Sequence, residues 1–226
     1  MERKFSFCVG EIYHLYNRGV NRQLVFLSDH DRFRFLILLY LCNNEAEVHI
    51  SNYNQGHDHI KLGDYFSIER GKPLVEIIAY CLMPNHFHLL IREIKEGGTS
   101  KFMLKVLTGY GMYFNKKNKR TGPVFEGCFK ARHVIEDSYL EYLLAYIHLN
   151  PVKIKDENSW SGKKIAKPAE AKEFLDSYRF SSYPAFLGQN WVENSILNLG
   201  ILADDLISQQ KNTRELIKIW SEFEEQ

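Results

Sequence analysis

Hydrophobic and polar residues alternate in some stretches of this chain and recur at helical spacing in others. Alternating or continuous apolar stretches predict strands, whereas apolar positions every three or four residues predict helices. The predicted strands are 11–18, 75–79 and 81–92, and the predicted helices are 29–43, 100–116 and 137–150. Residues 44–73 are polar and irregular, which indicates an excursion between a helix and a strand. The pattern therefore predicts a mixed α+β fold.

Polar residues and proline mark the ends of the predicted helices. Asp29 or Asp31 stands near the start of the first helix, and Ser100 is the expected N-cap of the second. Pro151 follows Asn150 and predicts the end of the third helix.

Composition narrows the class of protein without identifying a function. The chain has 226 residues, of which 45% are hydrophobic and 14% aromatic, enough to bury one sizeable core. The net charge of +1 argues against a basic coat but allows a local basic patch. The four cysteines include no CxxC pair, which predicts reduced thiols rather than a zinc site or disulfides. No signal peptide or apolar run of about 18 residues is evident, so we expect a cytoplasmic protein without a membrane segment.

The most informative chemical feature is the triplet His86, Phe87 and His88 at the end of an apolar run. Side chains alternate along a strand, so the two histidines point the same way and the phenylalanine points opposite. Two imidazoles on one face can hold a divalent metal. The alternative is a pair of partly exposed strand histidines without a ligand. His57 and His59 repeat the spacing in a polar stretch, and we expect them to be solvated.

A second candidate lies on the third predicted helix. Tyr146 and Asn150 are four residues apart, so they share one helix face. The Asn150 amide can be a third metal ligand while the Tyr146 phenol attacks a group that the metal polarises. The alternatives are that Tyr146 is a core aromatic, or that Tyr142, one turn earlier, is the nucleophile. His148 lies on another face, and we expect it outside the metal shell.

Basic residues gather between positions 101 and 132, with eight Lys or Arg residues against one acid, Glu126. Aromatic residues are interleaved with them, at Tyr110, Tyr113, Phe114, Phe125 and Phe129. Basic groups can contact phosphates and aromatic rings can stack on exposed bases, which predicts a nucleic-acid surface. The alternative is a solvated loop with core aromatics. The predicted DNA-binding residues are Lys116, Lys117, Lys119, Arg120, Lys130 and Arg132, together with Arg18 and His14 from the first strand.

Taken together, these motifs resemble the single-tyrosine HUH transposases, and in particular the branch of REP-associated tyrosine transposases. The resemblance covers about residues 10–188 and rests on several motifs in order. These are Tyr13–Gly19, Pro84–Leu90, Arg120–Gly127, Tyr146–Lys153 and Tyr178–Tyr183. Many single-tyrosine transposases carry glutamine where Asn150 stands, whereas the REP-associated branch uses asparagine.

The resemblance implies a ferredoxin-like antiparallel sheet with helices on one face and the other face open for nucleic acid. It implies a catalytic domain over residues 1–188. The residues after it, 189–226, are rich in Leu and Ile and predict a helical C-terminal extension, helical from about Asn194, which falls outside the family motifs. The resemblance also implies a metal-dependent single-stranded DNA endonuclease and strand transferase, in which Tyr146 forms a 5′-phosphotyrosine intermediate. His86, His88 and Asn150 would hold Mg²⁺ or Mn²⁺.

The partner implied by the resemblance is single-stranded DNA with a hairpin or palindromic repeat, bound by a monomer or a homodimer. Two alternatives stay open at this point. One is a catalytically inactive nucleic-acid-binding protein on the same fold, and the other is a metal-dependent RNA-processing enzyme on a similar open sheet.

Overall fold

The computed structural model describes residues 6–47, 61–155, 160–161, 164–165 and 167–222. Within them, four antiparallel strands form a sheet in the order β2-β3-β1-β4. The strands are β1 (Ile12–Arg18), β2 (Val75–Met83), β3 (His86–Glu93) and β4 (Lys130–Val134). One long helix separates β1 from β2 and another separates β3 from β4, which is the ferredoxin-like arrangement. The predicted α+β class is confirmed. His57 and His59 lie outside the described residues.

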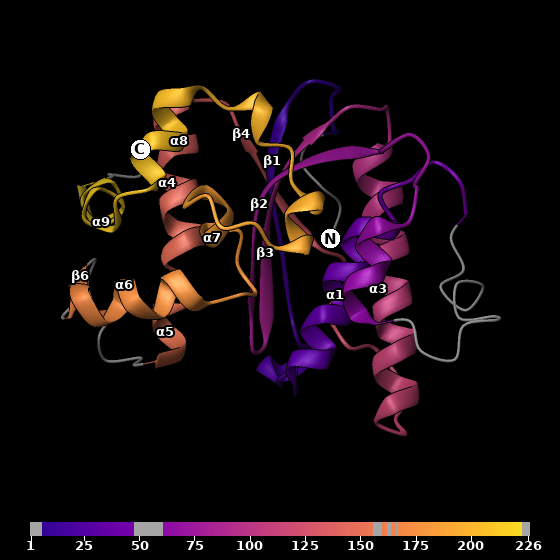
Figure 1. Cartoon of the computed structure of the whole chain (residues 1–226). Coiled ribbons are helices and arrows are strands. Elements are labelled where there is room, and N and C mark those ends of the chain that lie inside the picture. Colours follow the sequence, from indigo (N-terminus) through magenta and orange to yellow (C-terminus); the bar gives the residue numbers. More distant parts are fainter. Residues whose placement is uncertain (1–5, 48–60, 156–159, 162–163, 166, 223–226) are drawn as a thin grey trace.

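Helices α1 (Asp29–Leu41) and α3 (Gly98–Lys117) cover one face of the sheet (Figure 1). The main core lies between these two layers, where Phe35 of α1, Phe87 of β3 and Phe102 of α3 are fully buried. The remaining helices are η1 (Val20–Arg22), η2 (Leu62–Ser67), α4 (Asp137–Leu149), α5 (Val152–Lys155), α6 (Pro168–Ser177), α7 (Tyr183–Phe186), η4 (Val192–Ile196), η5 (Leu199–Ile201), α8 (Asp204–Gln210) and α9 (Thr213–Glu222). A short hairpin pairs β5 (Trp160–Ser161) with β6 (Lys164–Ile165).

The opposite face of the sheet is covered in part, which corrects the expectation that it would be open. Helices α4, α7 and α8 lie on that side (Figure 1). Cys81 of β2 and Leu90 of β3 pack there against Leu144 of α4 and Phe186 of α7 in a second core. The strands β2 and β3 carry apolar side chains on both faces of the sheet, so both faces must be shielded from water. The strip that stays accessible is the polar one described below.

The C-terminal residues form several short helices rather than one long one, and they build on the rest of the chain. Leu216 and Trp220 of α9 pack against Ala145 and Leu149 of α4 in a third core. The region therefore supports α4 from the side away from the sheet. His148 contributes a polar link, since its Nδ1 lies 2.9 Å from the amide oxygen of Gln210 in α8.

The start of α3 shows a different cap from the predicted one. The helix begins at Gly98, and its N-cap is Gly97 in the left-handed conformation, so the prediction of Ser100 as the cap was wrong. The buried carboxylate of Glu93, at the end of β3, accepts hydrogen bonds from the backbone N–H groups of Gly97 and Thr99. A carboxylate at this position complements the positive end of the helix dipole.

All four cysteines are free thiols, as predicted, with Cys42 and Cys81 buried and Cys8 and Cys128 exposed. In the described part of the chain, a search for helices long and apolar enough to cross a membrane finds none.

Candidate metal and nucleophile site

Strand register places the polar residues of the accessible strip side by side. Tyr16 of β1 pairs with His88 of β3 on one side and with Lys130 of β4 on the other. One step along the sheet, Arg18 pairs with His86. Directly paired residues point to the same face, so these side chains form two neighbouring rows. The shared face that the sequence predicts for the two histidines follows from this register.

The imidazoles are held by hydrogen bonds through one ring nitrogen each. His86 Nδ1 lies 2.6 Å from the Asn85 side-chain oxygen, so this nitrogen donates and Nε2 keeps a lone pair. His88 Nδ1 lies 2.9 Å from Nε2 of His14, a buried residue of β1. The remaining nitrogen of His88, Nε2, is buried and makes no hydrogen bond within the described residues. His14, which the sequence suggests as a DNA contact, thus orients a candidate ligand.

Burial keeps all three imidazoles neutral at neutral pH. It lowers the pKa of His14 and of His86 to about 4 each, with positive charges nearby acting in the same direction. Burial also lowers the pKa of His88 well below its ordinary value, and the neighbouring His14, His86 and Lys153 add to this effect. A neutral imidazole offers the lone pair that a metal ion requires.

Tyr146 of α4 lies at the edge of the second and third cores, with its ring against the histidines. Its ring is half-buried and meets the His88 ring edge to face, with the centroids 5.4 Å apart. Burial raises the pKa of the Tyr146 phenol, and a hydrogen bond with the Asn150 side chain opposes that shift. The phenol therefore stays protonated at neutral pH unless another group assists it.

Asn150 ends α4 with its side chain fully buried. Its amide nitrogen donates to the Tyr146 carbonyl, and its oxygen accepts from the Lys153 ammonium at 3.2 Å. The same ammonium lies 5.2 Å from the centroid of the Tyr146 ring. The amide oxygen that the sequence predicts as a ligand is therefore bound to a cation, and its role as a metal ligand stays a prediction.

The donor set fits a divalent metal in kind. Among the described residues, no group of three or more His, Cys, Asp or Glu side chains comes together as a ligand set. The candidates are therefore two neutral imidazoles and the Asn150 amide, with the buried and unpartnered Nε2 of His88 as the observation that most favours a ligand. Imidazole and oxygen donors together suit Mn²⁺ and Mg²⁺.

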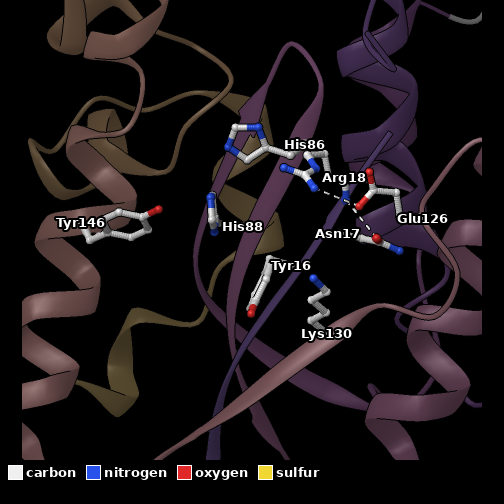
Figure 2. A pocket seen from close by; sticks show the side chains of 8 residues that line it. All are labelled: Tyr16, Asn17, Arg18, His86, His88, Glu126, Lys130 and Tyr146. Atoms are coloured by element: carbon white, nitrogen blue, oxygen red, sulfur yellow. Dashed lines mark hydrogen bonds and ion pairs between the residues drawn. The ribbon is translucent and has the colours of Figure 1, made fainter. Parts of the chain in front are cut away.

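A cleft of about 250 Å³ opens in front of the histidines and Tyr146 (Figure 2). Arg18 and Glu126 form an ion pair on the side of the cleft opposite Tyr146, with 3.1 Å between Nη2 and the carboxylate (Figure 2). Lys130 lines the same cleft and is exposed. Two of the predicted DNA-binding residues, Arg18 and Lys130, thus stand next to the candidate nucleophile. The complete lining is Tyr16, Asn17, Arg18, His86, His88, Glu126, Lys130 and Tyr146.

Lys153, Glu126 and Tyr16 are site residues that were not assigned a role from the sequence. Each stands inside a motif that the resemblance uses, so the motif marked the segment but not the side chain. Lys153 stands one helical turn after Asn150, so its ammonium lies beside the Asn150 side-chain amide. In the sequence, Glu126 stands out only as the one acidic residue between positions 101 and 132. His148, by contrast, points away from the site, as expected, and its Nε2 lies 3.0 Å from the Ser182 hydroxyl.

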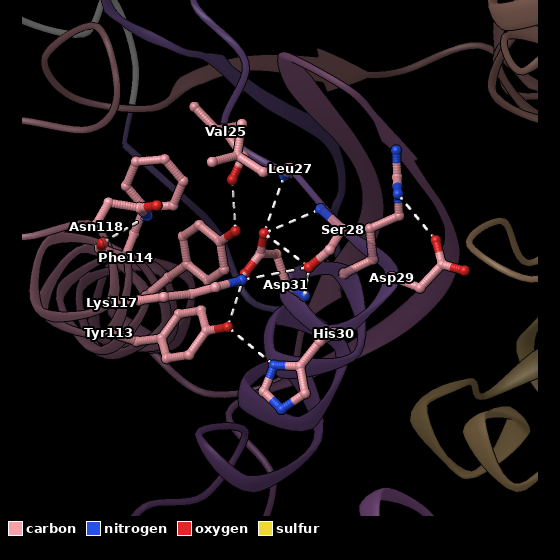
Figure 3. Close-up of polar contacts among 12 residues, drawn as sticks. Val25, Leu27, Ser28, Asp29, His30, Asp31, Tyr113, Phe114, Lys117 and Asn118 are labelled. Carbon is pink, nitrogen blue, oxygen red and sulfur yellow. Dashed lines mark hydrogen bonds and ion pairs between the residues drawn. The ribbon is translucent and has the colours of Figure 1, made fainter.

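The basic segment divides into residues near the site and residues away from it. Lys130 and Arg132 lie on β4 beside the site, whereas Lys117 pairs with the buried Asp31 carboxylate near the start of α1 (Figure 3). Tyr113 also donates to that carboxylate. Lys117 thereby joins α1 to α3. Lys116 and Lys119 are exposed at the end of α3, and Arg120 donates to the Pro123 carbonyl.

The aromatic residues of this segment do not form a stacking surface, so that part of the interpretation was wrong. Tyr110, Phe114, Phe125 and Phe129 are buried members of the main core. Tyr113 packs against the core and contacts Asp31. Tyr110 and Phe114 pack α3 on the core, and Phe125 and Phe129 pack the segment that follows α3.

A comparison with family models finds no match for this chain, and a comparison with curated protein sequences finds none either. Among solved structures, the chain is similar to one described as a REP-associated tyrosine transposase bound to a REP hairpin. The two superpose with a TM-score of 0.50 at 13% sequence identity, covering 85% of this chain and 90% of the other. At this identity the similarity shows a shared fold, the one expected from the motifs.

Proposed function

We propose that this protein is a metal-dependent enzyme that nicks and rejoins single-stranded DNA at or near hairpins, in the manner of a REP-associated tyrosine transposase. The observation that supports this best is the meeting of Tyr146 with His88. A phenol from a helix and an imidazole pair from a strand, far apart in sequence, face the same cleft. The fold shared with a transposase that binds a REP hairpin adds to the argument.

In the proposed reaction, Tyr146 Oη attacks the phosphorus of a phosphodiester and forms a phosphotyrosine bond. The bond from phosphorus to the 3′ oxygen breaks, and that oxygen takes up a proton while the phenol loses one. The products are a 5′-phosphotyrosine and a free 3′-hydroxyl. Attack by a 3′-hydroxyl reverses the step, so strands are rejoined without an external energy source.

The side chains around Tyr146 have separate parts in this proposal. His86, His88 and Asn150 would hold Mg²⁺ or Mn²⁺, which when bound polarises the phosphodiester and offsets the charge of the transition state. His14 orients His88 through their hydrogen bond. Arg18 and Lys130 bring positive charge to the cleft and suit phosphate oxygens.

The test uses the full chain, single-stranded DNA with a hairpin and flanking segments, and Mn²⁺. We expect a protein–DNA adduct that survives denaturation, with the protein joined to the 5′ phosphate at the break and a free 3′-hydroxyl on the other fragment. Tyr146→Phe should abolish the adduct and leave binding of the DNA close to wild type. Tyr40→Phe removes a phenol from α1, on the other side of the sheet, and is the matched control that should keep the adduct.

The same experiment decides between the alternatives. Mapping the modified peptide separates Tyr146 from Tyr142 as the nucleophile. Tight binding without an adduct, with Mn²⁺ or Mg²⁺ and with several hairpins, supports an inactive nucleic-acid-binding protein instead. Cleavage of RNA hairpins in preference to DNA would favour an RNA-processing enzyme.

A further inference from the structure

A second cleft adjoins the first at Tyr146. It has a volume of about 300 Å³, and it shares Tyr16, His88 and Tyr146 with the first cleft. The two clefts therefore meet at the candidate nucleophile. The residues that line only the second cleft are His14, Arg132, Tyr139, Tyr142 and Leu143.

Aromatic rings form one wall of the second cleft. Tyr139, Tyr142 and Tyr146 follow each other on one face of α4, at spacings of three and four residues. Adjacent rings are nearly parallel, with angles of 23° and 25° between their planes and centroids 6.0 Å apart in both cases. All three rings are half-buried, so part of each is exposed to the cleft that they line.

The charge of the second cleft complements the backbone of a nucleic acid. Arg132 of β4 is exposed, and its guanidinium carbon lies 4.6 Å from the centroid of the Tyr139 ring. Among the described residues that line this cleft, none is acidic, whereas Glu126 lines the first. A guanidinium beside aromatic rings can bind a phosphate while the rings stack on a base.

We propose that this cleft seats one unpaired nucleotide next to the scissile phosphate, with its base against Tyr142 and Tyr139 and its phosphate at Arg132. The proposal rests on the proposed function, because Tyr146 fixes where the scissile phosphate lies. A base inside a duplex already stacks on its neighbours, so the cleft selects single-stranded over double-stranded DNA next to the nick. Stacking on a π face is tolerant of base identity.

The experiment measures equilibrium binding of the full chain to labelled hairpin DNA, without divalent metal so that no cleavage occurs. Tyr142→Leu removes the ring and keeps an apolar side chain, and it should weaken binding by about 5- to 100-fold. Tyr142→Phe keeps the ring and should bind within about threefold of wild type. Circular dichroism confirms that each variant is folded.

An abasic scan of the single-stranded flank locates the base. When the abasic position is the one next to the scissile phosphate, Tyr142→Leu and wild type should bind the DNA with equal affinity. When the abasic position lies elsewhere, Tyr142→Leu should bind more weakly than wild type. Arg132→Gln removes the positive charge of an exposed side chain and keeps its polarity, and circular dichroism checks its fold as well. The substitution should weaken binding and lower the slope of log K against log salt by about one.

The outcomes separate this proposal from the proposed function. If Tyr142→Leu binds like wild type, or its penalty is the same at every abasic position, the stacking cleft is disproved even when the wild-type adduct forms. If the position-specific penalty appears but no adduct forms with Mn²⁺, the cleft stands and the nicking activity does not. If Arg132→Gln leaves the salt dependence unchanged, the phosphate is not at Arg132.

Discussion

Acid should destabilise this protein through His148, the histidine that joins α4, the helix that carries Tyr146, to α8. Its side chain is fully buried, its Nδ1 donates to the Gln210 amide oxygen, and its Nε2 lies 3.0 Å from the Ser182 hydroxyl. Burial is the main cause that lowers its pKa to about 4. In the unfolded chain the same imidazole titrates near 6.5.

The sign and size of the effect follow from these two pKa values. Because the folded pKa is the lower one, the unfolded state binds more protons between pH 6.5 and 4. The stability that neutral His148 contributes is present above that range and is lost as the pH falls through it. At pH 5 the unfolded imidazole is almost fully protonated and the folded one almost neutral. The difference costs about 2 kcal/mol of the free energy of unfolding, relative to pH 7.

Equilibrium urea unfolding at pH 7 and pH 5, followed by tryptophan fluorescence, measures this contribution. Other histidines also titrate, so the comparison is with His148→Gln, whose amide can replace both hydrogen bonds and does not titrate. The loss of free energy from pH 7 to pH 5 should be about 2 kcal/mol smaller in His148→Gln than in wild type. Equal losses in the two proteins would show that His148 is protonated or solvated in the folded state.

Two further predictions concern lysines of the site and of the basic segment. Lys153→Met should tighten Mn²⁺ binding in a calorimetric titration, because it removes the ammonium bound to the Asn150 amide oxygen. The control Lys130→Met, which removes a lysine that lines the first cleft, should have a smaller effect. Equal effects of the two variants would point to general charge repulsion alone. Lys117→Met should lower the free energy of unfolding by about 1–2 kcal/mol, because the buried Asp31 carboxylate loses its cation. The control Lys116→Met changes an exposed lysine and should alter the free energy of unfolding by less than about 0.5 kcal/mol. Loss of DNA affinity without loss of stability in Lys117→Met would refute this structural role.

Sequence patterns are informative here where a local rule decides the outcome. The alternation of side chains along a strand is local, and it was enough to predict that His86 and His88 share a face. The helix spacing of Tyr146 and Asn150 is local too. The cap of α3 is not, because the carboxylate that binds its N–H groups comes from the end of the preceding strand at Glu93.

Long-range packing decides what the patterns left open. The interleaving of aromatic residues with lysines between 101 and 132 favours base stacking in the sequence, but these rings pack in or against the main core, some from α3 and others, Phe125 and Phe129, from the segment after it. Partly accessible rings stand instead on α4, where Tyr139 and Tyr142 line the second cleft. The sequence marks this helix through Tyr146 and Asn150 and gives no sign of a stacking role for its other tyrosines. A ring's exposure depends on which helix face meets the sheet, and residue type does not determine that face.

The position of the nucleophile depends on both sides of α4. On the sheet side, Leu144 and Ile147 pack in the second core, and on the other side Ala145 and Leu149 pack against α9. Tyr146 stands between these contacts and contributes to both cores. A phenol must lie within a fraction of an ångström of its productive place for attack, so the residues that fix α4 bear on the proposed chemistry. The C-terminal helices, which lie outside the recognised motifs, therefore belong to the support of the candidate site.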